Sequence, residues 1–197
     1  MKNIRPKSFL GIKLYLFLIF IIVGLSGCVE RQYFDDTGGA PPITGLFTEI
    51  GGKISGKLIR SDSPYLIKED LTVESSDTLI IEPGTELYFD DGKKLIVQGT
   101  LIADGTRFRP ILFTAYKTFW EGIKFLYSNH NSIIQFCIIE KIIFEKQDGT
   151  GYSAISLLGS NAGLKNNYII ENRSRSGGAI GLSNSSLSVY NNIFSKK

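Results

Sequence analysis

The sequence contains few of the residues that build disulfide frameworks and histidine-based active sites. Its 197 residues include two cysteines, one histidine, one tryptophan and one methionine. Two cysteines allow at most one disulfide, which excludes a densely disulfide-linked fold. The single histidine, His130, lies in the turn-like stretch SNHNS without a Ser, Cys or carboxylate partner at a recognisable spacing. We therefore expect His130 to be exposed rather than catalytic.

Hydrophobic runs of membrane-spanning length are also missing. The longest uncharged apolar stretch, residues 14–25, has twelve residues, whereas a spanning helix needs about twenty. Four basic residues and no acidic residue precede this stretch. A basic segment followed by a short apolar segment is typical of a signal peptide, which we place at residues 1–27.

The apolar stretch ends in Leu-Ser-Gly-Cys at residues 25–28, and this arrangement resembles the signal and lipobox of bacterial lipoproteins. The resemblance implies cleavage before Cys28 and acylation of its thiol. Acyl chains anchor a protein because each buried methylene contributes about 0.8 kcal/mol. Val29 rather than Asp follows the cysteine, which in such lipoproteins favours the outer membrane of a Gram-negative cell. The alternative is an ordinary signal peptide or a short membrane anchor with an incidental cysteine.

Charge gives no reason to expect a nucleic-acid partner. The formal net charge is +3, but four of the 22 basic residues and none of the 19 acidic residues lie in residues 1–27. The remaining chain is therefore almost neutral, without a basic patch of the kind that binds phosphates. No motif indicates a cofactor, and the GGxGxD calcium repeat is absent.

The organisation changes after the predicted signal. Residues 28–52 contain Gly-Gly twice and Pro-Pro once, which predicts a flexible tether. Residues 53–197 should form one all-β domain, because short runs of alternating apolar residues recur, such as Leu79 and Ile81. Turn phrases such as EPGT and ADGT separate these runs. No segment here has a convincing helical stripe, so almost no helix is expected.

The C-terminal part repeats itself with a shift of 25 residues and no gap. GLKNNYII at residues 163–170 aligns with SVYNNIFS at residues 188–195, and a looser copy, SIIQFCIIE, lies upstream. Strand-rich repeats of this size predict a parallel β-helix with coils stacked about 4.8 Å apart. Asn167 and Asn192 should then form a column at a bend, ended by the small, readily buried Cys137. Cys137 is therefore interpreted as structural rather than as a reactive thiol, and lipidation of the other cysteine would leave it without a disulfide partner.

The same shift aligns Leu157 with Leu182 in a column that should face the interior, or bore, of the helix. We expect Asp at either position to disrupt the stack, because a charge in the bore has no partner. After Phe194 no capping coil covers the bore and the strand edges. Two hypotheses follow: the chain is a truncated version of a longer β-helix, which we favour, or its open end docks onto another subunit.

Longer phrases carry a family resemblance. The order of DLTVESSDTLIIEPGTELYF, KKLIVQGTLIADGT, PILFTA, FWEGIKF and SIIQFCIIE is similar to bacterial surface proteins with right-handed parallel β-helix repeats of the pectate-lyase-like superfamily. The similarity covers residues 66–194. It implies the fold but not one function, because lyases, hydrolases and adhesins share it.

The catalytic residues of the enzymes in this superfamily are not evident. A pectin-type hydrolase needs clustered Asp, and a lyase needs a basic residue with acids that hold calcium. The 25-residue repeat has no matched carboxylates. Arg173 and Arg175 could act as a lyase base or hold a sugar acid, but a basic loop is more often a solvated surface. Asp90 and Asp91 could bind calcium, but an Asp-Gly turn explains Asp91 without a metal, and no metal site is predicted.

Three aromatic residues in AYKTFWEGIKF are the best candidates for binding. Tyr116, Phe119 and Trp120 could stack on sugar rings from a flat sheet. The alternative is that Trp120 covers the side of a coil, as an aromatic residue before this strand does in the similar proteins. Together with Arg173 and Arg175, these are the candidate carbohydrate-binding residues.

The functional prediction is a lipid-anchored β-helix of the cell envelope that acts as a structural or binding surface, for example as an adhesin, rather than as a catalyst. The alternative is a partial or degenerate polysaccharide lyase or glycoside hydrolase. A groove lined by Arg173, Arg175 and several carboxylates would distinguish that alternative. The predicted partners are a membrane through Cys28, a cell-surface polysaccharide or glycan, and another subunit at the open end.

Overall fold

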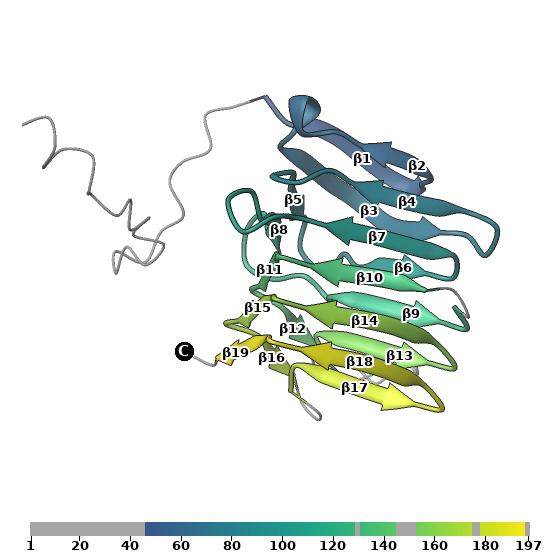
Figure 1. Cartoon of the computed structure of the whole chain (residues 1–197). Helices are drawn as coiled ribbons and strands as arrows, with labels where there is room; N and C mark the ends of the chain where they lie inside the picture. The colour runs from purple at the N-terminus through teal and green to yellow at the C-terminus, as the bar shows by residue number, and fades with distance from the viewer. Residues whose placement is uncertain (1–45, 129–130, 145–152, 175–177, 196–197) are drawn as a thin grey trace, which may run out of the picture. The chain divides into compact units, whose positions relative to one another are not determined.

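The structure, a computed structural model, describes residues 46–128, 131–144, 153–174 and 178–195. Short β-strands provide nearly all the regular structure of these residues, and they stack in successive coils (Figure 1). One 3-10 turn, η1 (Arg60–Asp62), is the only helical element that the described residues form. The near absence of helix was expected from the missing helical stripe.

Three parallel sheets form the walls. The largest contains β1 (Thr48–Lys53), β3 (Tyr65–Val73), β5 (Glu86–Phe89), β6 (Leu95–Val97), β8 (Ile111–Ala115), β9 (Ile123–Leu126), β11 (Cys137–Glu140), β13 (Ile155–Leu158), β15 (Tyr168–Ile170), β17 (Ile180–Ser183) and β19 (Ile193–Ser195). The second contains β2 (Gly56–Leu58), β4 (Thr78–Ile81), β7 (Thr100–Asp104), β10 (Ser132–Gln135), β14 (Asn161–Lys165) and β18 (Ser186–Tyr190). The smallest pairs β12 (Ile143–Phe144) with β16 (Arg173–Ser174).

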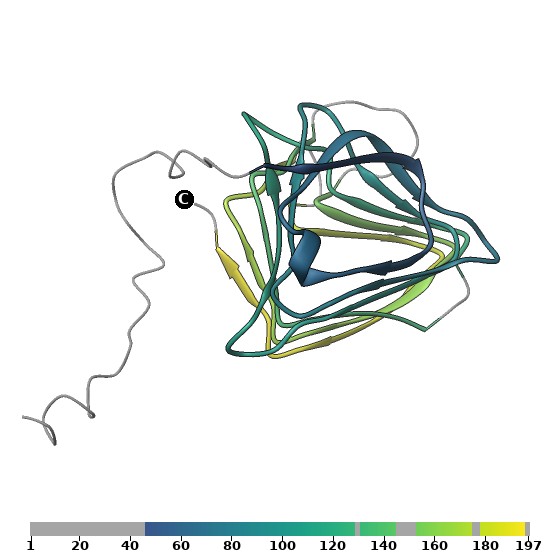
Figure 2. The same ribbon diagram turned by 90° about the horizontal axis from the view of Figure 1, so that it is seen from above.

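These strands wind around one interior. The strand pairings are parallel, and hydrogen-bonded neighbours come from successive coils, as in the order β7, β10, β14 and β18. Seen from above in Figure 2, the strands outline a ring around the bore. The fold is therefore a right-handed parallel β-helix, and the predicted fold class is confirmed.

Columns of apolar side chains fill the bore. Leu71, Leu95, Ile123 and Ile155 stand above one another in successive coils, and all four are fully buried. Alternate residues of each strand point inward because the side-chain period of a strand is two. Burial of such a side chain stabilises the fold by about 1.5–3 kcal/mol. The columns are the main source of stability for the stack.

The predicted 25-residue register is confirmed. Leu157 on β13 pairs with Leu182 on β17, and Ile169 on β15 pairs with Phe194 on β19. The looser copy also aligns as predicted, since Ile134 on β10 pairs with Leu164 on β14.

The two adjacent asparagines of each repeat have different structural roles at the same bend. Asn166 and Asn191 have φ values of 56° and 51°, in the left-handed region that Asn tolerates better than most residues. Asn167 is buried, and its Oδ1 accepts the backbone N–H of Cys137 at 2.8 Å. The Nδ2 of Asn167 donates to the backbone oxygen of Ile134 and to Oδ1 of Asn192. The predicted column is present, and each member satisfies polar groups of the coil before it.

Sequence reasoning missed a second ladder, at another bend. The hydroxyl of Ser160 accepts the backbone N–H of Ser128, and the hydroxyl of Ser185 accepts the backbone N–H of Ser160. Ser160 and Ser185 align under the same shift of 25 residues. Two serines in a Ser-rich sequence do not predict a ladder, because solvated turns are also rich in Ser.

The domain begins earlier than predicted. β1 lies within the segment assigned to the tether and pairs with β3 from Thr48 onward. The Gly-Gly pair that suggested a linker is a strand irregularity: the register shifts between Ile50 and Gly52, and Gly52 has a φ of 75°. A Cβ atom at Gly51 would lie 2.9 Å from Cβ of Glu69. The rest of the tether, the signal and Cys28 lie outside the described residues.

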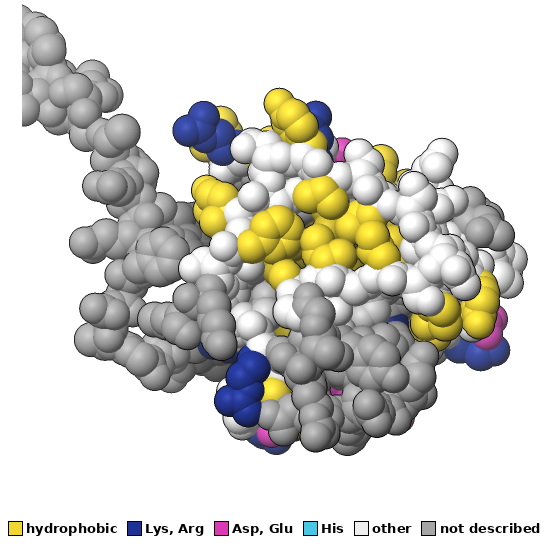
Figure 3. Space-filling view, turned by 90° about the horizontal axis from the view of Figure 1, so that it is seen from below, with side chains coloured by type: hydrophobic (Ala, Val, Ile, Leu, Met, Phe, Trp, Pro, Cys, Tyr) yellow, Lys and Arg dark blue, Asp and Glu magenta, His cyan; other side chains and the backbone are white. Residues whose placement is uncertain are grey.

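The last coil differs from the others in exposure. Leu182 occupies the same column as Leu157 but is 52% exposed, against 2% for Leu157. No described coil lies beyond β17, β18 and β19, so their inward side chains are covered on one side only. In the view from below (Figure 3), apolar side chains gather at this end of the stack. Leu182 therefore shares the inward column of Leu157, as predicted, but the described residues cover it less. No helix within the described residues is long and apolar enough to cross a membrane.

Candidate functional site

The structure places Trp120 in the hydrophobic core. Its ring is fully buried and stacks on Phe89, with 4.2 Å between the ring centroids. The indole Nε1–H donates to the backbone oxygen of Glu140 at 2.7 Å. A buried ring has no face for a sugar, so this geometry corrects the proposal that Trp120 contacts carbohydrate. Trp120 covers the side of a coil, which was the alternative interpretation.

Tyr116 belongs instead to an exposed group of three rings. Phe47 makes edge-to-face contacts with Tyr88 and Tyr116, with centroid distances of 5.5 and 5.3 Å. Tyr116 is 38% exposed, while Phe47 and Tyr88 are half-buried. We call Phe47, Tyr88 and Tyr116 the aromatic cluster. Sequence reasoning missed two of its members, because Phe47 precedes β1 and meets Tyr88 and Tyr116 only when the coils stack.

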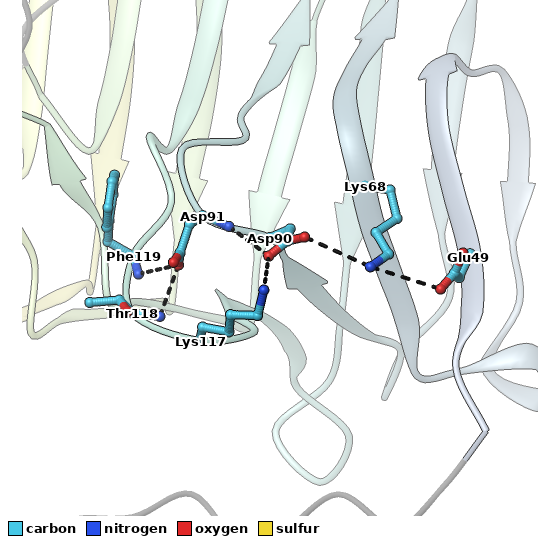
Figure 4. Close-up of polar contacts among 7 residues, drawn as sticks. All are labelled: Glu49, Lys68, Asp90, Asp91, Lys117, Thr118 and Phe119. Atoms are coloured by element: carbon cyan, nitrogen blue, oxygen red, sulfur yellow. Dashed lines mark hydrogen bonds and ion pairs between the residues drawn. The ribbon is translucent and has the colours of Figure 1, made fainter.

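A row of charged residues links neighbouring coils, as Figure 4 shows. Lys68 lies 3.8 Å from a carboxylate oxygen of Asp90 and 4.0 Å from one of Glu49. Lys117, next to Tyr116 in sequence, lies 3.2 Å from the other oxygen of Asp90. We call Glu49, Lys68, Asp90 and Lys117 the charged row. These pairs are partly solvated, so each contributes little to stability.

The charged row sets the ionisation of its central members. The backbone N–H of Asp91 donates to Asp90, and Lys117 and Lys68 lie nearby; together they lower the pKa of Asp90 from its ordinary value. The same contact with Asp90 raises the pKa of Lys117. Both groups are therefore charged at neutral pH. Lys117 also lies over the ring of Tyr116, with Nζ 5.8 Å from the centroid.

Asp91 has a structural role at the neighbouring turn. Its Oδ1 accepts the backbone N–H groups of Thr118 at 2.9 Å and Phe119 at 3.2 Å (Figure 4). These bonds tie one coil to the next. In the part of the chain that the structure describes, no group of three or more His, Cys, Asp or Glu residues is arranged to hold a metal ion. Phe119 is half-buried and is positioned by this turn.

The other predicted residues are not brought to the aromatic cluster. Arg173 is exposed on β16, which pairs with β12 in the small separate sheet. Arg175 and His130 lie outside the described residues. Cys137 is fully buried, and burial raises the pKa of its thiol far above the ordinary value. This environment fits its predicted structural place at the end of the Asn column.

A buried polar group on the wall of β9 was not expected from the sequence. Lys124 alternates with Ile123 and Phe125, which face the bore, so it points outward, yet it is fully buried. Its Nζ donates to the backbone oxygen of Ser153 at 2.6 Å and lies 3.4 Å from the hydroxyl of Ser156. A lysine that points outward from a strand is normally exposed to solvent, so the sequence pattern did not predict that Lys124 is buried.

No family model matches the chain, and no solved structure matches it. One curated protein, Protein bark beetle of Drosophila melanogaster, is 35% identical over 65 residues, which is 33% of this chain. The chain spans only about 2% of the length of that protein, so the match shows neither a family nor a function.

Proposed function

We propose that this protein is a lipid-anchored β-helix of the bacterial cell envelope, related to the pectate-lyase-like superfamily, and that it binds glycans through the aromatic cluster. The observation that carries the binding proposal is the meeting of three rings from three coils on the outside of the stack. The β-helix supports the relationship, and the LSGC sequence at residues 25–28 supports the anchor.

The chemistry of the aromatic cluster suits a sugar. The apolar faces of Tyr and Phe rings can cover the C–H faces of a pyranose, and a phenol hydroxyl adds a polar group at the edge of the ring. Tyr88 donates its hydroxyl to Glu86 at 3.1 Å, so a carboxylate lies beside the rings. The charged row supplies further donors and acceptors for sugar hydroxyls. The β-helix positions these groups rigidly, which lowers the entropic cost of binding.

The binding proposal predicts a specific loss in one variant. The whole chain should bind one or more glycans on an array of neutral and acidic oligosaccharides. Tyr116→Ala should raise the dissociation constant about tenfold, which corresponds to a loss of about 1.4 kcal/mol in binding free energy. Phe108→Ala is the matched control, because Phe108 is 86% exposed on the loop between β7 and β8. Circular dichroism verifies the fold of each variant. An array without any bound glycan, or equal weakening by both variants, would refute the proposal.

The proposed lipid anchor predicts that cells will attach a labelled fatty acid to the protein. In cells grown with an alkyne-bearing palmitate analogue, the wild-type chain should incorporate the analogue, and Cys28→Ser should lose all of it, because acylation requires that thiol. Cys137→Ser is the control: Cys137 is buried, so this variant should keep the label. In-gel fluorescence after coupling to a dye measures the outcome. Full labelling of Cys28→Ser would exclude the lipoprotein anchor.

A further inference from the structure

The aromatic cluster borders a carboxylate that forms no ion pair with any described residue. Glu86 is exposed at the start of β5, two residues before Tyr88, so both side chains point to the outer face of this strand. The hydroxyl of Tyr88 donates to Oε2 of Glu86 at 3.1 Å. The ion pairs among the described residues involve other carboxylates. A negative charge therefore lies at the polar edge of the Tyr88 ring.

The two lysines of the charged row are already engaged by other carboxylates. Lys117 lies 3.2 Å from Asp90, and Lys68 lies 3.8 Å from Asp90 and 4.0 Å from Glu49. The contact with Asp90 raises the pKa of Lys117, which stabilises the charged form of this lysine in the pair. An anionic sugar at the aromatic cluster would have to compete with these carboxylates for a cation. The charge that remains to be matched beside Tyr88 is negative.

Two arginines lie at the turn before β5 without pairing with Glu86. A Cβ atom at Gly84 would lie 3.0 Å from Nε of Arg60 and 3.4 Å from Cβ of Arg109, so both residues lie beside this turn. Neither arginine forms an ion pair with a carboxylate of the described residues. Because they are a separate source of positive charge, a test of charge preference must include an acidic sugar.

The rings of the aromatic cluster also attract positive charge. The face of an aromatic ring is negative, so an ammonium group within about 6 Å of the ring centroid is attracted to it. The chain itself makes one such contact, because Nζ of Lys117 lies 5.8 Å from the centroid of Tyr116. A ligand that carries an ammonium group can therefore be held by the rings and by the carboxylate of Glu86 together.

We propose that the aromatic cluster and Glu86 select glycans with free amino groups, that is amino sugars without an N-acetyl group, over neutral and acidic glycans. This inference rests on the proposed glycan binding and names the class of sugar that binds best. An amino sugar offers an apolar C–H face to the rings and an ammonium group to Glu86. N-acetylation removes the positive charge, and a uronic acid brings a second carboxylate towards Glu86, where like charges repel.

Titration calorimetry with three β-linked oligomers of one length, built from glucosamine, N-acetylglucosamine or glucuronic acid, tests the proposal. The whole chain is used in mild detergent, in a slightly acidic buffer that keeps sugar amines protonated and glutamates ionised. The glucosamine oligomer should bind about fivefold more tightly than the N-acetylglucosamine oligomer, which is the size expected of one exposed ion pair with a cation–π contact. The glucuronic acid oligomer should bind most weakly.

Three variants assign the preference to Glu86. Glu86→Gln removes the charge but keeps an acceptor for the Tyr88 hydroxyl, so the fivefold preference should disappear while the N-acetylglucosamine oligomer binds as before. Asp104→Asn is the matched control: it removes the same charge from an exposed position on β7, in the second sheet, and should keep the preference. Glu86→Lys should reverse the order, so that the glucuronic acid oligomer binds best. A misfolded variant would not gain binding in this way.

The outcomes separate this inference from the proposed function. Equal binding of the glucosamine and N-acetylglucosamine oligomers, binding of neither, tightest binding of the acidic oligomer, or an unchanged preference in Glu86→Gln would each overturn the preference for amino sugars. Glycan binding itself stands after any of these results if the array shows a glycan whose binding Tyr116→Ala weakens. An array without any bound glycan would remove the proposed function and this inference together.

Discussion

Replacing Leu157 with Asp is expected to lower the free energy of unfolding by more than about 4 kcal/mol, enough to prevent cooperative folding of a marginal domain. Leu157 is buried in the bore between Phe125 above and Leu182 below. A carboxylate there loses its water without gaining a partner. It also removes apolar contacts to both neighbouring coils. Urea unfolding followed by circular dichroism measures the change.

Leu182→Asp provides the matched comparison within the same column. Leu182 is half exposed, so the carboxylate at this position keeps much of its hydration, and we expect a loss of only about 1 kcal/mol. From the sequence alone we expected Asp at either position to disrupt the stack, because the repeat shows that the two residues align but not how deeply each is buried. Equal destabilisation by the two variants would contradict the difference in burial.

Trp120→Ala is expected to cost about 3–5 kcal/mol in stability, because it empties a large buried site. The ring stacks on Phe89 at 4.2 Å and lies parallel to Phe113 at 6.4 Å. All three aromatic residues are fully buried, so the core around them can collapse only partly. The variant should melt well below the wild-type protein in a calorimetric scan.

Trp120→Phe isolates the contribution of the indole N–H. This variant keeps an aromatic ring but leaves the backbone oxygen of Glu140 without its donor, so a loss of about 1–3 kcal/mol is expected. Its effect should lie below that of Trp120→Ala. If Trp120→Ala weakened glycan binding without any change in stability, the assignment of Trp120 to the core would be wrong.

The register of the stack was predictable because the repeat is exact in length. A shift of 25 residues aligns Ile155 with Ile180 and Asn167 with Asn192, and strands in a β-helix pair position by position. One residue of slippage would turn every inward side chain outward, so the apolar pattern allows only one alignment. The place of Cys137 in the column of Asn167 and Asn192 followed from the looser upstream copy, because Cys137 lies 30 residues before Asn167.

The aromatic cluster could not be predicted, because its members do not belong to the repeat. Phe47, Tyr88 and Tyr116 share no repeat spacing, and their meeting depends on where β1 begins and on how the first coils stack. The sequence left two interpretations of Trp120 open, a sugar contact or the side of a coil, because an isolated aromatic residue has no pattern that shows whether its ring faces solvent or the core. The burial of Lys124 was missed because the alternation of residues along a strand shows whether a side chain points inward or outward. It does not show whether other residues cover that side chain.

The amino-acid sequence was sufficient to specify the all-β class, the 25-residue repeat, the inward columns and the Asn column, because these depend on local periodicity and on pairing between equivalent positions. The burial of individual side chains was decided only by the tertiary structure. Leu157 is buried while Leu182 is half exposed, and Trp120 is buried while Tyr116 is exposed. Lys124 is also buried. The physical reason is that side-chain direction follows from the strand period of two, whereas burial depends on which coils and turns lie alongside.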